Sequence, residues 1–316
     1  MTRQGSKDKR PAPDAKAAVG RRRLLALSAS LGAGALVLPS AARAQAAGED
    51  TYDRIKRTGM FNLGARESTP PYGYKDKDGT YVGFATEMAQ AVHANLQKEL
   101  GVPVTLNYIP VTSQTRIPLL QNGTIDMEAG ATTVTRARRM VVEFPVAHFV
   151  TSTALIVAAD GPVRKAEDLA GKRVGVPLGG VGDPLFRDLN QKGRLKPPCT
   201  IVGFPDHPQA FTALETGAID TYAVEGPILF GLRAKSSDPA KWRIFDAGLD
   251  SFLQAFPMRP DSPKFKRVVD LTLVGLFVSG DWNRLYDKYF GPGSPAPYPM
   301  ADSLKTLVIF NSWPEQ

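Results

Sequence analysis

Short apolar runs alternate with amphipathic stretches along the first half of the chain. The apolar runs predict strands at 60–64, at 104–109 and from Ile125 onward. Between them, apolar residues at helical spacing predict a helix over 86–100 and another that begins near Ser113. Each helical stretch ends at a glycine, which is a common helix stop. The pattern is typical of an α/β fold with mainly parallel strands.

The second half of the chain repeats this alternation. Strands are predicted at 172–176, at 201–204 and from Ala218 onward. A helix is predicted over 183–191, directly after a glycine-rich turn, and another helix is predicted to end at 216–217. The two halves therefore have the same order of elements.

One joint between a helix and a strand occurs in both halves. LQNGTID at 120–126 and LETGAID at 214–220 share Leu, Gly, Ile and Asp at the same places. We interpret this as two lobes of similar construction, although chance similarity of a common joint is the alternative. Extended segments near 143–158 and 245–258 are predicted to cross between the lobes and to form a hinge. The predicted organisation is lobe 1 at 50–150 and 251–300, lobe 2 at 151–250 and a C-terminal strap at 291–316.

The first 44 residues have the three parts of an export signal. Three arginines at 21–23 precede an apolar run at 24–38, and Ala42-Arg43-Ala44 follows as a small-residue cleavage site. The apolar run has 15 residues, fewer than the roughly 20 that span a bilayer, which disfavours a membrane anchor. We predict cleavage near Ala44 and a periplasmic location. General secretory and twin-arginine export both remain open, since RRRLLA fits the latter.

This segment carries most of the positive charge of the chain. Residues 1–44 hold nine of the 39 basic residues and two of the 31 acidic ones, which leaves 30 against 29. A nearly neutral remainder lacks the basic surface that nucleic acid binding requires. With one cysteine, Cys199, and three histidines, we expect no internal disulfide, no metal site and no cofactor.

Four segments resemble one protein family. They are GARES at 64–68, VTSQTRIPLLQNGTIDMEAG at 111–130, TTVTRARR at 132–139 and PDHPQAFTALETGAID at 205–220. In these segments the chain resembles the polar amino-acid substrate-binding proteins of ABC importers (solute-binding protein family 3), in particular the glutamate/aspartate-binding group. The resemblance implies a two-lobed periplasmic-binding-protein-like fold of type II. It also implies a monomer that binds an amino acid and delivers it to a membrane permease.

The resemblance assigns one end of the site to the α-carboxylate and α-ammonium groups of the ligand. Arg138 takes the place of the family's carboxylate-binding arginine, with Thr133 beside it. The chemistry is independently reasonable, because the planar guanidinium makes two charge-assisted hydrogen bonds to a carboxylate. The alternative is that Arg138 is a solvated member of a basic cluster with Arg136 and Arg139.

The other end is assigned to the side-chain carboxylate of an acidic ligand. The resemblance gives this role to Arg66, Ser113, Arg116 and His207. Taken alone, Arg116 reads as a surface charge and His207 as a loop residue. A bound carboxylate would favour the cationic form of His207.

Three arginines and one acidic residue, Glu225, give the predicted site a charge of about +2. This charge suits a ligand of about −1, whereas a neutral ligand would leave Arg66 and Arg116 without a partner. The whole predicted ligand-binding set is Arg66, Ser68, Ser113, Arg116, Ala131, Thr132, Thr133, Arg138, Gly180, Val181, His207 and Glu225.

Three departures from the family pattern affect the α-amino end. Ala131 stands where acidic-ligand members usually have Ser, and Glu225 replaces an Asp. The second-lobe loop LGGVGD at 178–183 lacks the usual hydroxyls and offers only backbone N–H groups. A dicarboxylate or a modified amino acid therefore remains an alternative ligand.

We predict a binding protein without catalysis, in which the lobes close around the ligand. The alternative enzyme would resemble the cyclohexadienyl dehydratases, with His207, Glu225 and Glu128 as candidate acids or bases. A sensor domain that docks to a receptor is a further alternative. The sequence has no nucleophile elbow, metal-ligand cluster or Walker-type phosphate loop.

Overall fold

The computed structural model describes residues 48–313. The predicted export signal at 1–44 lies outside these residues. Within the described part, the helices are too short or too polar to cross a bilayer.

The first lobe contains a parallel three-stranded sheet. Its strands are β1 (Met60–Ala65), β5 (Thr105–Pro110) and β6 (Met127–Ala129), in the order β5-β1-β6. The accompanying helices are α2 (Thr51–Thr58), α3 (Phe84–Leu100) and α4 (Arg116–Gln121), with the short α5 (Arg136–Arg139) after β6. The predicted strands and helices of this half are confirmed to within a few residues. Helix α4 begins three residues after the expected start near Ser113, which leaves Ser113 in the loop that follows β5.

A small antiparallel sheet is inserted between β1 and α3. It consists of β2 (Ser68–Thr69), β3 (Gly73–Lys75) and β4 (Tyr81–Val82). The chain then turns sharply into α3 at Gly83, whose φ is +128°. A Cβ at Gly83 would lie 2.4 Å from the carbonyl oxygen of Tyr72, so this close approach requires glycine. The insertion begins at Ser68, three residues after the carboxyl end of β1.

The second lobe contains a five-stranded sheet in the order β10-β9-β11-β8-β12. Its strands are β8 (Thr153–Ala158), β9 (Arg173–Pro177), β10 (Thr200–Phe204), β11 (Thr221–Glu225) and β12 (Trp242–Asp246). The helices are α6 (Gly182–Gln191), α7 (His207–Glu215) and α8 (Gly226–Lys235), with one-turn helices η1 (Ala166–Leu169) and η2 (Pro239–Lys241). The predicted strands at 172–176 and 201–204 are confirmed.

The expectation of mainly parallel strands holds for the sheet β5-β1-β6 of the first lobe and for β10-β9-β11 in the second. Strands β9, β10 and β11 are parallel, whereas β8 and β12 run antiparallel to their neighbours. The physical reason lies in the crossings. Strand β8 enters the sheet as the continuation of one crossing and runs opposite to the other four strands. Strand β12 is connected to β11 through α8 and runs in the same direction as β11, and β8 pairs between the two.

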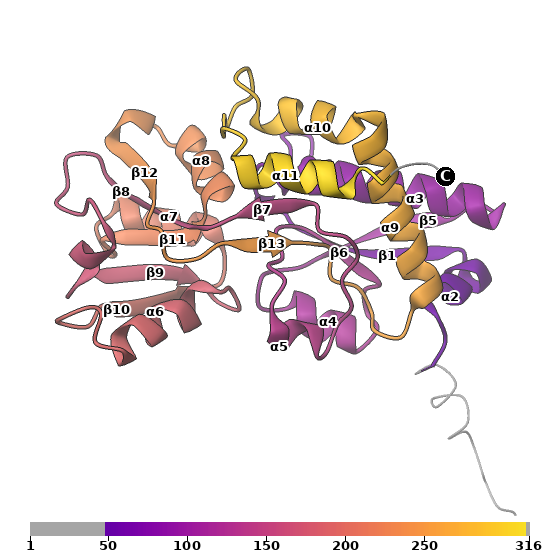
Figure 1. The fold of residues 1–316 in the computed structure, drawn as a ribbon, viewed down its shortest axis with the longest axis horizontal. Helices are drawn as coiled ribbons and strands as arrows, with labels where there is room; N and C mark the ends of the chain where they lie inside the picture. Colours follow the sequence, from indigo (N-terminus) through magenta and orange to yellow (C-terminus); the bar gives the residue numbers. More distant parts are fainter. Residues whose placement is uncertain (1–47, 314–316) are drawn as a thin grey trace, which may run out of the picture. The chain divides into compact units, whose positions relative to one another are not determined.

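The two crossings are hydrogen-bonded to each other. Strand β7 (Phe149–Thr151) leads into β8, and β13 (Phe252–Gln254) follows β12 (Figure 1). They pair antiparallel, with Phe252 opposite Thr151 and Gln254 opposite Phe149. The extended segments predicted at 143–158 and 245–258 contain these strands, as a hinge requires.

The chain ends in three helices on the first lobe. They are α9 (Pro263–Ser279), α10 (Asp281–Phe290) and α11 (Asp302–Asn311). Within the described residues, the C-terminal strap predicted at 291–316 is irregular up to residue 301 and helical over Asp302–Asn311. Helix α11 docks because Leu304 is fully buried and the Asn311 amide donates to the carbonyl oxygen of Ala147 at 2.6 Å.

One residue of the irregular segment links the two lobes. Tyr298 is tied to α10, since its N–H donates to the carbonyl of Phe290 and its carbonyl accepts from the Tyr286 hydroxyl. Its ring meets the ring of Phe230 in α8 at a centroid distance of 5.3 Å. The same ring lies 3.1 Å from where a Cβ at Gly226 would stand. A side chain at Gly226 would therefore crowd the ring of Tyr298.

Candidate functional site

The candidate residues gather where parallel strands end. Arg66 follows β1, Ser113 follows β5, and residues 130–133 follow β6. In the second lobe, His207 follows β10 and Glu225 closes β11. The carboxyl ends of strands in open α/β sheets are the usual ligand-binding edge. Here the two edges contact each other through the side chains described below.

Arg66 is the centre of a buried polar cluster between the lobes. Its Nη1 donates to Ser113 Oγ at 3.0 Å, and its Nη2 lies 3.5 Å from His207 Nε2. The Nδ1 of the same histidine is 2.7 Å from the Tyr222 hydroxyl. Arg66, Ser113 and His207 are all buried. The structure therefore brings together three of the four residues assigned to a side-chain carboxylate.

Arg116, the fourth residue, is also buried and pairs with Glu128. It is 3% exposed, so it is not a surface charge, and its Nη1 lies 3.7 Å from Glu128 Oε1. Thr132 donates to Glu128 Oε2 at 2.6 Å. Thr132 thus contacts the ion pair at this end of the site. Glu128 is a negatively charged site residue that the predicted ligand-binding set did not include.

Asp206 connects the two lobes next to this cluster. It accepts a short hydrogen bond from Ser68 Oγ, and its carboxylate lies 3.6 Å from Arg66 Nη2. It also caps α7 by accepting from the N–H of His207. The sequence signal for a helix cap was present at this position, but it gave no indication of a partner in the other lobe.

Arg138 is bound by backbone oxygens from both lobes. Its Nη1 donates to the carbonyl of Thr133 at 2.7 Å and its Nη2 to the carbonyl of Gly179 at 2.8 Å. Burial, with the nearby Arg116 charge, lowers the pKa of Arg138 to about 10, so the guanidinium stays protonated at neutral pH. Arg136 and Arg139 are exposed, whereas Arg138 is half-buried. Arg138 is therefore distinct from the solvated cluster that was its alternative.

Glu225 reaches across from the second lobe to the same end. Thr133 Oγ1 donates to Glu225 Oε1 at 3.3 Å. Burial raises the pKa of the Glu225 carboxyl above its usual value, and this effect exceeds the opposing influence of Arg116 and Arg138. Ala131 is buried beside these residues and carries no polar side-chain atom.

The loop before α6 differs in part from its predicted role. The N–H of Gly180 donates to the carbonyl of Pro177 at 3.0 Å, so it serves a tight turn. Val181 is the N-cap residue of α6 and has no side-chain cap. The contact with the first lobe is made instead by Gly179, which has φ +73°. A Cβ there would lie 2.6 Å from the carbonyl oxygen of Ser113, so the approach of the lobes requires glycine at this position.

The charge of the site differs from the predicted value of about +2. Three arginines, at positions 66, 116 and 138, face three carboxylates, at Glu128, Asp206 and Glu225. The formal charges balance. The prediction was wrong because it counted Glu225 alone. Glu128 lies in a buried strand, and the side chain of Asp206 contacts its arginine only across the lobes.

His207 is held in its neutral form by these surroundings. Burial lowers its pKa well below 6.5, and the charges of Arg66 and Arg116 act in the same direction. The cationic form expected with a bound carboxylate therefore requires that carboxylate to offset both effects. This expectation remains a prediction.

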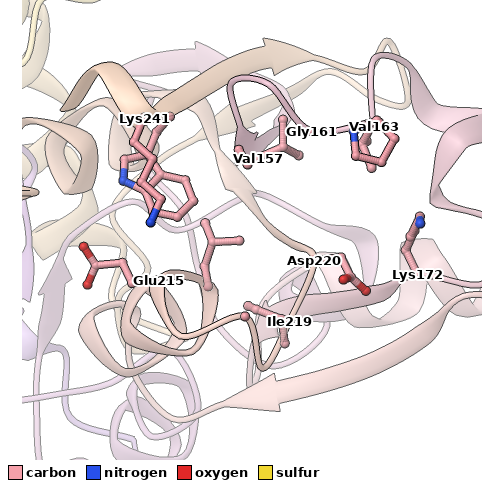
Figure 2. Close-up of a pocket in the computed structure, with 13 residues that line it drawn as sticks. Val157, Gly161, Val163, Lys172, Glu215, Ile219, Asp220 and Lys241 are labelled. Atoms are coloured by element: carbon pink, nitrogen blue, oxygen red, sulfur yellow. The ribbon is translucent and has the colours of Figure 1, made fainter. Parts of the chain in front are cut away.

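A separate cavity lies in the second lobe and contains none of the predicted site residues. It has a volume of ≈ 240 Å³, and its lining includes Val157, Ile219 and Trp242. Figure 2 shows Lys172, Asp220, Glu215 and Lys241 around it. Among residues 48–313, no three His, Cys, Asp or Glu side chains are grouped so that they could hold a metal ion.

Comparisons with known proteins give one consistent result. Residues 61–292 match the family model described as bacterial extracellular solute-binding proteins, family 3. The chain is similar to the glutamate/aspartate import solute-binding protein of Escherichia coli K12, with 31% identity over 90% of this chain and 94% of the relative. It is also 31% identical to the L-glutamate/L-aspartate-binding protein of Pseudomonas aeruginosa, over 82% of this chain and 87% of that protein.

A solved structure supports the two-lobed fold. A mutant of ArgBP from T. maritima matches with a TM-score of 0.66 and 26% identity. The match covers 76% of this chain and 98% of that protein.

Proposed function

Because the chain belongs to the bacterial extracellular solute-binding proteins of family 3, we propose that it binds an acidic amino acid between its lobes for an ABC importer. The family membership carries the general role of a solute-binding protein. The choice of glutamate or aspartate is our inference from the site and from the ligands for which the two relatives are named.

The observation that carries this choice is the buried cluster of Arg66, Ser113, Arg116 and His207. Two buried guanidinium groups with a hydroxyl and an imidazole form a site suited to a carboxylate. A ligand carboxylate at this position would receive several charge-assisted hydrogen bonds, each contributing about 1.5–3 kcal/mol.

The opposite end suits the α-amino and α-carboxylate groups. Arg138 presents a guanidinium, and Glu225 presents an acceptor beside Thr133. Arg138 uses one N–H of each terminal nitrogen for its two bonds to carbonyl oxygens, and the other N–H donors of its guanidinium group are left for a ligand carboxylate. Because Gly179 belongs to the second lobe, we infer that closure of the lobes around the ligand forms the bond from Arg138 to its carbonyl.

The predicted export signal supports a periplasmic location for this activity, and we propose a membrane permease as the partner. An enzyme on the same scaffold is the second candidate, because Glu225 and His207 are buried acid–base groups whose pKa values are shifted. Sequence motifs for catalysis are lacking, and the two relatives above are named for import and binding.

Isothermal titration of the mature protein tests the proposal. Carried-over ligand is first removed by unfolding and refolding. L-glutamate, L-aspartate, L-glutamine, L-histidine, succinate and prephenate are then compared. We expect glutamate or aspartate to bind most tightly, with Kd on the order of 1 µM. Tighter binding of succinate would move the ligand class to dicarboxylates, and turnover of prephenate would contradict the transport role.

A further inference from the structure

The buried carboxylate of Glu128 lies at the end of the site that we assign to a ligand's side-chain carboxylate. Glu128 is fully buried in β6, within reach of Arg116 at 3.7 Å. A Cβ at Gly130 would stand 2.2 Å from Glu128 Oε1 and 3.1 Å from Arg66 Cγ. The carboxylate therefore lies against Gly130, and the stem of Arg66 passes on another side of the same glycine.

The positive charges of Arg66 and Arg116, the two arginines near Glu128, repel each other. Burial lowers the pKa of Arg66, the charge of Arg116 lowers it further, and the charge of Glu128 raises it. Both arginines are nearly fully buried, at 2% and 3% exposure. Two adjacent buried cations are costly unless a carboxylate is close to them. Glu128 supplies that charge from within the fold.

This counter-charge has a consequence for ligand choice. A ligand carboxylate that binds Arg66 and Arg116 must share these cations with Glu128, and it is repelled by Glu128. A neutral amide in the same place feels little of this repulsion. Two carboxylates that share one site strongly disfavour each other's charged form, so the effect on selectivity is measurable.

We propose that Glu128 is a specificity-determining residue that limits how strongly the site prefers a side-chain carboxylate over the corresponding amide. This inference rests on the proposed function, because it takes Arg66 and Arg116 to bind the distal group of an amino acid. Thr132 supports the role, since its hydroxyl donates to Glu128 Oε2 and fixes the carboxylate.

The test is the ratio of the Kd for L-glutamine to the Kd for L-glutamate, measured by isothermal titration at pH 7.5. Glu128→Gln keeps the side-chain shape and an acceptor for Thr132 but removes the charge. We expect the ratio to rise about tenfold or more, mainly through tighter glutamate binding. We also expect a lower melting temperature without ligand, which glutamate restores.

The matched control is Glu215→Gln, which removes the same charge from the second lobe outside the site. It should leave the ratio unchanged. Glu128→Asp keeps the charge and should keep the ratio within about threefold of the wild-type value. If the Gln variant unfolds without ligand, refolding in glutamate followed by competition with glutamine gives the same ratio.

An unchanged ratio in Glu128→Gln overturns the inference. A fallen ratio also overturns it, because it would show that Glu128 mainly holds Arg116 in place for the ligand. If the wild-type protein binds neither glutamate nor glutamine, the proposed function itself fails, and the inference fails with it. If the wild type binds glutamate but the variant ratio does not rise, only the inference fails.

Discussion

The two ends of the site are built differently. At the distal end, side chains hold each other: Arg66 contacts Ser113 and His207, and Arg116 pairs with Glu128. At the α-amino end, Arg138 is held by two carbonyl oxygens of the backbone. The first end is a network of buried charges with fixed geometry, whereas the second depends on where two loops lie.

This difference suggests that one end of the site determines specificity and the other determines affinity. A network of side chains can be tuned by one substitution without moving the backbone, so the distal end is suited to select among ligands. The Gly179 carbonyl that binds Arg138 belongs to the second lobe, so the α-amino end is also sensitive to the approach of the lobes. We expect variants at the distal end to change selectivity and variants at the α-amino end to change affinity for every amino acid.

The largest effect is expected for Arg138→Ala. The variant loses two charge-assisted hydrogen bonds to the α-carboxylate, so affinity should fall by about 3 kcal/mol or more, or at least about 100-fold. Titration with glutamate, aspartate and glutamine should show similar losses for all three. Unchanged binding of any of them would place its α-carboxylate elsewhere.

A smaller but selective loss is expected for Arg116→Met. Glutamate should bind about 30–100-fold more weakly, because one charge-assisted hydrogen bond to its side chain is lost. Glutamine should change by less than about threefold, since it carries no charge at that end. Because Arg116→Met leaves the buried carboxylate of Glu128 without its partner, the double variant Arg116→Met with Glu128→Gln is the control. Equal losses for glutamate and glutamine would contradict the assigned role.

Glutamate binding should become tighter as the pH falls from 7.5 to 5.5. Burial holds the pKa of His207 well below 6.5, so the free protein has mainly neutral His207 at neutral pH. A bound carboxylate raises that pKa, so binding takes up a proton and is favoured at lower pH. We expect a change of about three- to tenfold for glutamate and almost none for glutamine.

Titration in buffers of different ionisation enthalpy measures the proton uptake directly. His207→Asn should abolish both the uptake and the pH dependence. If the wild type shows no proton uptake with glutamate, His207 stays neutral in the complex and does not form a charged contact with the ligand.

The smallest effect is expected for Ala131→Ser. The new hydroxyl would add one contact to the ligand ammonium and tighten glutamate binding about threefold, as a neutral hydrogen bond contributes about 0.5–1.5 kcal/mol. Succinate, which lacks an ammonium group, is the matched control and should not respond. An equal gain for succinate would show that the hydroxyl acts on the protein rather than on the ammonium.

Much of the fold was predictable because its strands and helices have strong local patterns. The helix at 86–100 ends at Gly101, which has φ +67°, and the strand at 201–204 is continuous and apolar. Helices α8 and α11 were not predicted. Helix α8 begins with Gly-Pro and is apolar over most of its length, so it lacks the alternation of apolar and polar residues that predicts an amphipathic helix. Helix α11 follows a proline-rich segment, within the stretch that was predicted to form a strap.

The site was predictable in its arginines and hydroxyls but not in its charge balance. Arg66, Ser113 and Arg116 lie in segments that resemble a known family, and the structure buries all three near the lobe junction. Asp206 reads as a helix cap, and its contact with Ser68 joins residues 138 positions apart. Such a pairing depends on how the lobes meet, which no local pattern encodes.

The contact of Tyr298 with the second lobe has a mechanical consequence. The residue is anchored on α10, yet its ring presses on α8 at Gly226 and Phe230. It therefore acts as a clasp beside the paired crossings β7 and β13, and any swing of one lobe against the other must slide or release it. If the lobes open to release a solute, the loss of this contact adds to the energy of opening, so we expect the C-terminal segment to affect how long a bound solute is retained.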